Sequence, residues 1–367
     1  MRVKQLYLLF AFAGFFLVAC SSSDKEKEIE PVPVPTPYQL QFSDRFQPPS
    51  IPEDNPLTVE GVALGRRLFY EKRLSGNNTI SCGSCHQQKL AFTDGQAFST
   101  GVDGQQTTRS SMSLVNLAWN KTFNWAGEAN SLEAQARIPI ENPLEMHQNM
   151  DEAVRELQNT ATYPNLFQKA FGTSTITSDL MLKALGQFTR TLISTNSRYD
   201  KYRAGEATLT VEELEGMQLF FTHPDPSRNL RGGNCGDCHG SDFFTLQQFH
   251  NNGLDVDFAD KGRGAVTGKA TDNGKFKAPS LRNIAVTAPY MHDGRLKTLE
   301  EVLNHYNDHI QNASPNLDPL IIEASNKIQG KSLELTPAEK AKIIKFLQTL
   351  TDDSFLKDER FSETSTP

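Results

Sequence analysis

The sequence has little cysteine, no run of Lys or Arg, and no apolar run of membrane-spanning length. Its 367 residues include five cysteines and carry a formal net charge of −7. A strongly basic face of the kind that binds nucleic acid is therefore not expected. The longest apolar run, residues 5–20, is shorter than the roughly 20 residues that cross a bilayer. Alternation of apolar and polar residues is also scarce, which disfavours a fold built of strands.

The N-terminal residues have the features of an export signal. A positive start, MRVK, precedes the apolar run, which ends in Leu-Val-Ala-Cys20 like a bacterial lipobox. We expect residues 1–20 to be a lipoprotein signal peptide and Cys20 to carry the lipid; an ordinary signal peptide with a chance cysteine is the alternative. The charged, proline-rich segment 21–44 predicts a flexible linker, with folded sequence from near Tyr38. The protein would then be exported and lipid-anchored in the bacterial cell envelope, touching the membrane only through this lipid.

The other cysteines form two closely spaced pairs, Cys82 with Cys85 and Cys235 with Cys238. Redox-active pairs normally occur in a βαβ context, which is not visible here, and a four-cysteine zinc site has about 15–20 residues between its pairs. Each pair is followed by a histidine, His86 or His239. Cys-x-x-Cys-His is the attachment motif of c-type haem, in which two thiols form thioethers and the imidazole binds the iron. The sequence therefore predicts two covalently bound haem c groups.

An internal repeat surrounds the two motifs. Residues 57–86 align with 209–239, since both begin Leu-Thr-Val-Glu, pass through Gly-x-x-Leu-Phe and end on the haem motif. A second block, 113–135, aligns with 280–302 at a constant offset. Identical residues around two identical motifs indicate duplication rather than shared composition.

Helix-start patterns indicate the fold class. Capping-box sequences begin at Thr210, Thr298 and Thr336, each followed by apolar residues at helical spacing. We predict a mainly α fold of two tandem cytochrome c-like haem domains related by internal duplication, 45–200 at the N-terminal side and 205–355 at the C-terminal side.

Further motifs resemble the bacterial di-haem cytochrome c peroxidases and their MauG relatives. They are FTDG after the first haem motif, W-x-G-x-x-x-x-L-x-x-Q-A, PLEM, and APSLRNIAVTAPYMHDGRLKTLEEVLNHY. The resemblance covers nearly all of residues 45–350. It implies that the haem of the first domain reacts with peroxide and that the haem of the second domain receives electrons.

The resemblance also implies catalytic residues. Glu145 in PLEM matches the distal carboxylate that moves a proton between the two oxygens of peroxide. Gln135 and Pro139 match residues that line the same distal pocket. Trp125 matches a tryptophan between the haems, which relays or shares oxidising equivalents.

Two positions depart from the typical peroxidases. Val102 stands in the loop where these have a distal histidine, so the first iron is expected to have an open site. Tyr306 stands where they have a methionine ligand to the second iron, fourteen residues past the histidine of HDG, as in the MauG branch. Met291 is the alternative ligand. The difference matters because a methionine raises the reduction potential and a tyrosinate should lower it.

The family also holds calcium through a side-chain amide and a T-x-P segment. Thr287 and Pro289 match this segment, whereas Ser110 replaces the amide. His292 matches a family histidine near the second haem. The remaining histidines are expected at the surface or in hydrogen bonds rather than as ligands: His147, His223, His250, His305 and His309.

These features predict a cytochrome c peroxidase that reduces hydrogen peroxide to water with electrons from a small cytochrome c or cupredoxin. A MauG-like oxidase of a protein or small-molecule substrate is an alternative, favoured by Tyr306 and by the missing histidine. A non-enzymatic di-haem electron carrier is a second alternative, although a carrier would not need Glu145, Gln135 or Trp125. The sequence does not decide whether the protein forms a homodimer.

Overall fold

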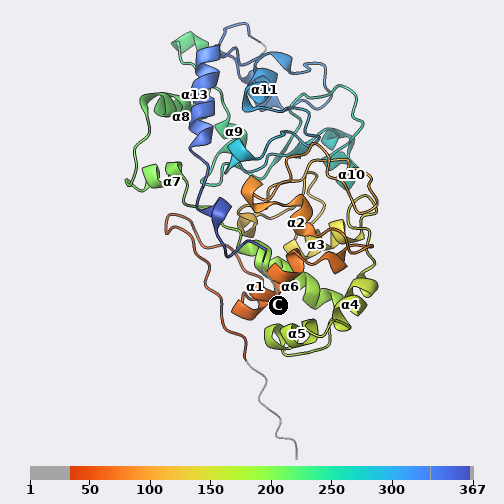
Figure 1. Cartoon of the computed structure of the whole chain (residues 1–367). Helices are drawn as coiled ribbons and strands as arrows, with labels where there is room; N and C mark the ends of the chain where they lie inside the picture. Colours follow the sequence, from red (N-terminus) through yellow and green to blue (C-terminus); the bar gives the residue numbers. More distant parts are fainter. Residues whose placement is uncertain (1–33, 331, 364–367) are drawn as a thin grey trace, which may run out of the picture. The chain divides into compact units, whose positions relative to one another are not determined.

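The computed structural model describes residues 34–330 and 332–363 (Figure 1). The predicted signal peptide, the lipid-bearing Cys20 and the first part of the linker lie outside them. Ordered backbone contacts begin late in the segment assigned to the linker, where Thr36 and Tyr38 hydrogen bond to Val59 and Leu57. In the part of the chain that is described, the helices are too short or too polar to cross a membrane.

The first half is built of helices that surround a buried core. Their bounds are α1 Val59–Phe69, α2 Cys82–Cys85, α3 Leu132–Glu141, α4 Met150–Gln158, α5 Tyr163–Phe171 and α6 Ser178–Arg190. Short 3-10 turns occur at Lys72–Leu74, Gln88–Leu90 and Leu117–Trp119. Helices α1 and α6 lie against each other and contribute many of the core side chains (Figure 1).

The second half repeats this plan with longer connecting loops. The helix α7 Arg198–Arg203 lies in the segment that connects the halves, and the helices of the second half are α8 Val211–Phe221, α9 Gly236–His239, α10 Arg263–Thr267, α11 Leu299–Asn304, α12 Pro319–Glu323 and α13 Pro337–Gln348. A π-helical turn, His305–His309, follows α11, and 3-10 turns occur at Pro226–Arg228, Ala270–Asp272, Ile284–Val286 and Phe355–Lys357. Strand β1, Phe249–His250, pairs antiparallel with β2, Phe276–Lys277. The prediction of a mainly α fold is confirmed.

The predicted helix starts are observed, with one difference in detail. Thr210 and Thr336 form reciprocal capping boxes with Glu213 and Glu339. Thr298 accepts a hydrogen bond from the backbone N–H of Glu301, but the Glu301 carboxylate accepts from Lys297 instead of returning to Thr298. In each case an otherwise unpaired N–H of the first turn gains a partner.

The duplication predicted from the repeat is confirmed by equivalent contacts in the two halves. Gly65 on α1 crosses α6 so closely that a Cβ atom would lie 1.9 Å from the carbonyl oxygen of Ala184. Gly216 on α8 crosses α13 in the same way, 2.0 Å from the carbonyl oxygen of Lys342. The glycine of Gly-x-x-Leu-Phe thus has the same packing role twice, since a side chain would separate the helices.

Two aligned asparagines provide further evidence of duplication. Asn116 and Asn283 both adopt left-handed backbone conformations, with φ of 58° and 62°. The backbone N–H of Asn116 donates to Leu192 after α6, and that of Asn283 donates to Leu350 after α13. The side chain of Asn283 also donates to the hydroxyl of Ser194, so the two equivalent turns meet.

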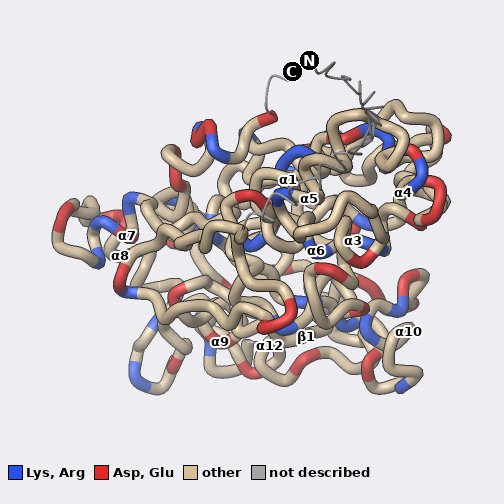
Figure 2. Tube along the Cα trace, turned by 90° about the horizontal axis from the view of Figure 1, so that it is seen from below, with Lys and Arg blue, Asp and Glu red and all other residues tan. Residues whose placement is uncertain are grey.

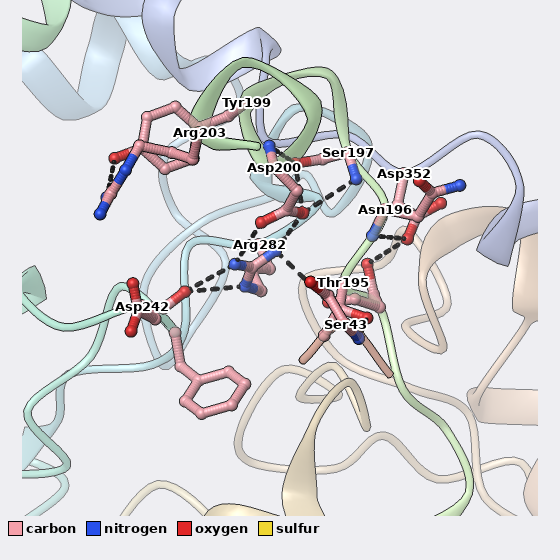
Figure 3. Close-up of polar contacts among 12 residues, drawn as sticks. Ser43, Thr195, Asn196, Ser197, Tyr199, Asp200, Arg203, Asp242, Arg282 and Asp352 are labelled. Atoms are coloured by element: carbon pink, nitrogen blue, oxygen red, sulfur yellow. Dashed lines mark hydrogen bonds and ion pairs between the residues drawn. The ribbon is translucent and has the colours of Figure 1, made fainter. Parts of the chain in front are cut away.

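A buried arginine connects the two halves (Figure 3). The side chain of Arg282 is 1% exposed and forms a two-pronged ion pair with Asp200, at 2.8 and 2.9 Å. The same guanidinium donates to the carbonyl oxygens of Asp242 and Ser194 and lies 5.0 Å from the ring centre of Phe46. Because Ser194 and Asp200 belong to the segment between the halves, Arg282 fixes that segment onto the second half.

Charged residues of the two signs are intermixed along the chain (Figure 2). Many of them pair locally, such as Arg109 with Asp260 and Glu128. The ion pair between Arg109 and Asp260 connects the first-half loop that contains Arg109 with the second half.

Replacing Arg282 by Met should destabilise the protein by about 3–5 kcal/mol, because the buried carboxylate of Asp200 would lose its counter-charge. Denaturant unfolding monitored by circular dichroism would measure the change. Arg155→Met is the matched control, since Arg155 pairs with Glu152 at an exposed site and should contribute less than about 1 kcal/mol. Equal losses in the two variants would contradict a central role of Arg282.

Candidate functional site

Both Cys-x-x-Cys-His motifs open onto one cavity of about 700 Å³. The cysteines and histidines of the two motifs line it, together with apolar side chains from both halves. A cavity that is mostly apolar and has a few converging polar groups is typical of cofactor sites.

In the first motif, the short helix α2 sets the geometry. Ser81 caps this helix and pairs reciprocally with Ser84, so Cys82 and Cys85 are one turn apart. His86 follows, and its Nδ1 lies 2.7 Å from the carbonyl oxygen of Phe92. Because a carbonyl can only accept, Nδ1 carries the proton and Nε2 keeps a lone pair for a metal. Burial lowers the pKa of His86, which favours this neutral form.

The second motif repeats the arrangement. Nδ1 of His239 lies 3.2 Å from the carbonyl oxygen of Phe244 and 3.1 Å from that of Pro279. Burial lowers the pKa of His239 to about 4. Both histidines therefore have a free Nε2 and a proton held at Nδ1, the arrangement that an iron ligand requires.

The four cysteines are free, and burial raises the pKa of Cys82, Cys235 and Cys238 to about 12 and that of Cys85 to about 11. Within residues 34–330 and 332–363, three or more His, Cys, Asp or Glu side chains nowhere gather into a cluster that could bind a metal ion. Two separate motifs on one apolar cavity fit haem better than a shared zinc ion.

Two buried polar atoms lack hydrogen-bond partners in the described part of the chain. They are Oε1 of Gln135 and Nε2 of His250, and both residues line the cavity. Since buried polar atoms are nearly always paired, their partners are expected in a group that occupies the cavity. This observation supports a bound cofactor there.

Glu145 is partly buried and lies close to the first motif. Its negative charge contributes to raising the pKa of both Cys82 and Cys85. Burial raises the pKa of Glu145 itself. A hydrogen bond from the side-chain amide of Asn142 to Oε1, at 2.7 Å, lowers this pKa, and the nearby negative charge of Glu128 raises it further. A partly buried carboxyl with a raised pKa and a fixed orientation is suited to accept and return a proton.

The loop that lacks the distal histidine lies beside this carboxyl. The backbone N–H of Val102 donates to the carbonyl oxygen of Glu145 at 2.8 Å. The backbone of Val102 therefore lies next to that of Glu145, and the Val102 side chain has no atom that could bind iron.

Trp125 lies where the two halves meet. Its indole N–H donates to the carbonyl oxygen of Ser110 at 2.9 Å, and its own carbonyl oxygen accepts from the backbone N–H of Lys277 at 2.9 Å. The ring also lines the cavity shared by the two motifs. This location agrees with the position that the resemblance implies.

Both candidate ligands of the second iron line the cavity, and both have unusual backbone conformations. Tyr306 lies in the π-helical turn, and Met291 has a φ of +73°. The side-chain amide of Asn252 lies 3.4 Å from the Tyr306 hydroxyl and 3.4 Å from the Met291 sulfur. Burial raises the pKa of Tyr306 to about 12, and Asn252 partly offsets this. Such turns and strained residues are frequent at functional sites.

Three of the other histidines form the hydrogen bonds that were expected of them. His147, His223 and His305 contact Asp103, Asn234 and the carbonyl oxygen of Asn252. His292 stacks on Phe276 with ring centres 3.7 Å apart.

His250 was not predicted to face the cavity. Its Nδ1 lies 2.6 Å from Asp318, and its side chain is 9% exposed. Asn142, Asn252 and Lys277 were also missed. Asn142 directly precedes PLEM in the sequence, and this adjacency could have identified it as a residue that contacts Glu145.

The possible calcium ligands lie at the same junction. Thr287 and Pro289 line the cavity, and the Ser110 hydroxyl donates to the carbonyl oxygen of Met291 at 2.9 Å. Calcium at this place stays a prediction.

Comparisons with known proteins identify the family. The family model described as di-haem cytochrome c peroxidase matches residues 59–208. Methylamine utilization protein MauG of Methylorubrum extorquens is 36% identical over 310 residues, which are 83% of this chain and 82% of that protein. The chain belongs to the di-haem cytochrome c peroxidase and MauG family.

Other relatives carry both kinds of name. Cytochrome c551 peroxidase of Nitrosomonas europaea is 33% identical over 303 residues, 81% of this chain and 82% of that protein. The crystal structure of a MauG-like protein associated with microbial copper homeostasis superposes with a TM-score of 0.80 at 38% identity, covering 89% of this chain and 99% of that one. Family membership thus confirms the resemblance and implies two haem c groups, for which the two Cys-x-x-Cys-His motifs are the predicted attachment sites.

Cys82→Ser and Cys235→Ser should each remove one covalently bound haem and leave the other, because each motif holds its own group. Haem staining and mass spectrometry of the intact protein would count the haems. Cys20→Ser is the control and should retain both. A two-haem mass in either motif variant would contradict the assignment.

Tyr306→Phe should change the absorption and electron paramagnetic resonance spectra of the second haem, whereas Met291→Leu should not. The reason is that the phenol oxygen is a ligand only if Tyr306 binds the iron. The opposite pattern would assign the ligand to Met291.

Proposed function

We propose that this family member is an exported, lipid-anchored peroxidase that reduces hydrogen peroxide to two waters. Its electrons would come from a small cytochrome c or cupredoxin in the periplasm. The observation that carries the proposal is the partly buried Glu145 carboxyl, held by Asn142, beside the first haem motif. An electron carrier has no use for such a group, which argues against the non-enzymatic alternative.

The chain's own residues would handle the protons. The reaction consumes two electrons and two protons for each peroxide and releases two waters. A haem iron bound by His86 would supply the coordination site and the electrons for cleaving the O–O bond. The Glu145 carboxylate takes a proton from one peroxide oxygen and returns it to the other, so that water can leave. Asn142 orients the carboxyl through Oε1, and Gln135 has an unpaired Oε1 to accept a hydrogen bond in the same cavity.

The two halves would have different functions, peroxide chemistry in the first and electron transfer in the second. The first has a distal carboxyl and, with Val102, no blocking ligand in its loop. The second has two candidate ligands, Tyr306 and Met291, that can close its iron to substrates. Trp125 at their junction would carry oxidising equivalents between the haems. A haem iron with a free coordination site is suited to react with peroxide, and a haem iron with two protein ligands is suited to transfer electrons.

A MauG-like oxidation of a protein or small-molecule substrate is the second candidate. Tyr306 in the position of the usual methionine favours it, and so does the similarity to proteins named MauG or MauG-like. Steady-state turnover of peroxide with a reduced small cytochrome or cupredoxin separates the two. Rapid turnover supports the peroxidase, and reaction with peroxide without turnover of these donors supports the second candidate.

Glu145→Gln should retain both haems but slow the reaction with peroxide by about 10²–10⁴, the usual contribution of a positioned acid–base group. In the unchanged protein the rate should fall as the pH falls through the raised pKa of Glu145, because the protonated carboxyl cannot act as a base. Stopped-flow mixing over a pH series measures both effects. Glu141→Gln is the control, since Glu141 is an exposed residue at the end of α3 that pairs with Arg137. Equal rates in the two variants would remove the role proposed for Glu145.

The fully oxidised protein should react with peroxide without prior reduction, since Val102 cannot occupy the first iron. Electron paramagnetic resonance at rest should show one high-spin and one low-spin haem. Two low-spin signals, with no reaction until one electron is added, would show that another residue closes the first site.

A further inference from the structure

Lys277 is a buried cation without an acidic partner. It lies on β2 and is 4% exposed. Its ammonium group donates to the carbonyl oxygen of Thr122 and lies 3.5 Å from the hydroxyl of the same residue. Among the described residues, no carboxylate forms an ion pair with it. Lysines are almost never fully buried unless they are paired.

The missing partner has an energetic consequence. Burial lowers the pKa of Lys277 to about 8, and no acidic group raises it again. One carbonyl and one hydroxyl supply dipoles but no negative charge. The protein therefore maintains an ammonium group at a place where a counter-charge would stabilise it.

Lys277 lines the same cavity as the two haem motifs. Among the described residues, Lys277 and Arg109 are the lysine and arginine side chains that line this cavity, and Arg109 is paired with Asp260 and Glu128. On the partner strand β1, His250 offers a second group with an unpaired atom, Nε2. A buried ammonium group without a counter-charge and an imidazole nitrogen without a hydrogen-bond partner thus both line the cavity, which indicates that the missing partner is polar and lies there.

The strand places Lys277 between the motifs. Its backbone N–H donates to Trp125 of the first half. Two residues further on, the carbonyl oxygen of Pro279 accepts from the ring of His239. Lys277 is thus connected through one hydrogen bond to the junction tryptophan and through a short segment to the iron-binding histidine of the second motif.

We propose that the ammonium group of Lys277 binds a propionate carboxylate of a haem in this cavity. Haem carries two propionates, which are the anionic part of an otherwise apolar group, and a buried ammonium–carboxylate pair satisfies both charges. The inference rests on the proposed function only in requiring that haem is bound. Lys277 is then a cofactor-binding residue that adjusts the potential of the haem it contacts.

Reduction potentials of the holoprotein test this proposal. In Lys277→Met an uncompensated propionate would favour the ferric state, so the ferrous-to-ferric ratio of one haem at a fixed potential should fall about tenfold, or about 59 mV for one electron. Spectroelectrochemical titration resolves the high-spin and low-spin haems and shows which of them contributes the propionate. Lys277→Arg should largely restore the potential. Lys275→Met is the matched control, because Lys275 is two residues away and pairs with Asp272.

A crystal structure of the unchanged holoprotein gives a second readout that does not depend on the folding of a variant. Nζ of Lys277 should lie within hydrogen-bonding distance of a propionate oxygen. A separation beyond about 4 Å from every propionate, or unchanged potentials in a Lys277→Met protein with both haems, would leave Lys277 as a cap on the Thr122 carbonyl and overturn the proposal. A mass without haem would instead refute the proposed function.

Discussion

The ion pair between Arg282 and Asp200 is the contact on which the relation of the two halves depends. Both side chains are buried, so neither charge can be left alone without a large loss of stability. Asp200 also caps α7 through Ser197, and the Arg282 guanidinium holds the carbonyl oxygen of Ser194. The segment between the halves is therefore fixed by charge, by capping and by backbone hydrogen bonds together.

Duplication supplied two similar frameworks, and a few substitutions made them different. Gly65 and Gly216 permit the same helix crossing, and Asn116 and Asn283 form the same turn. Within this common framework the first half has the partly buried carboxyl of Glu145, whereas the second half has Tyr306. The two halves therefore share the same helix packing. They differ in the side chains that face the cavity, and these side chains determine the reactions that each half can support.

Burial governs the chemistry of the cavity throughout. It raises the pKa of Glu145, lowers those of His86, His239 and Lys277, and leaves Nε2 of His250 without a partner. These groups have different local roles, yet each is in a form that a bound haem or its substrate could use. The same low-dielectric surroundings that make them costly also strengthen any interaction that they form with a cofactor.

The sequence by itself determined the haem motifs, the duplication, the helical class and the family, because these depend on spacing and on residue identity along the chain. Through the resemblance it also predicted Glu145, Gln135 and Trp125 as site residues, since each belongs to a contiguous motif. Only the tertiary structure revealed Lys277, Asn252 and His250 as groups of the same cavity. The residues that these side chains contact lie far away in the sequence. The loops of both halves decide whether such a lysine or histidine is solvated or buried without a partner.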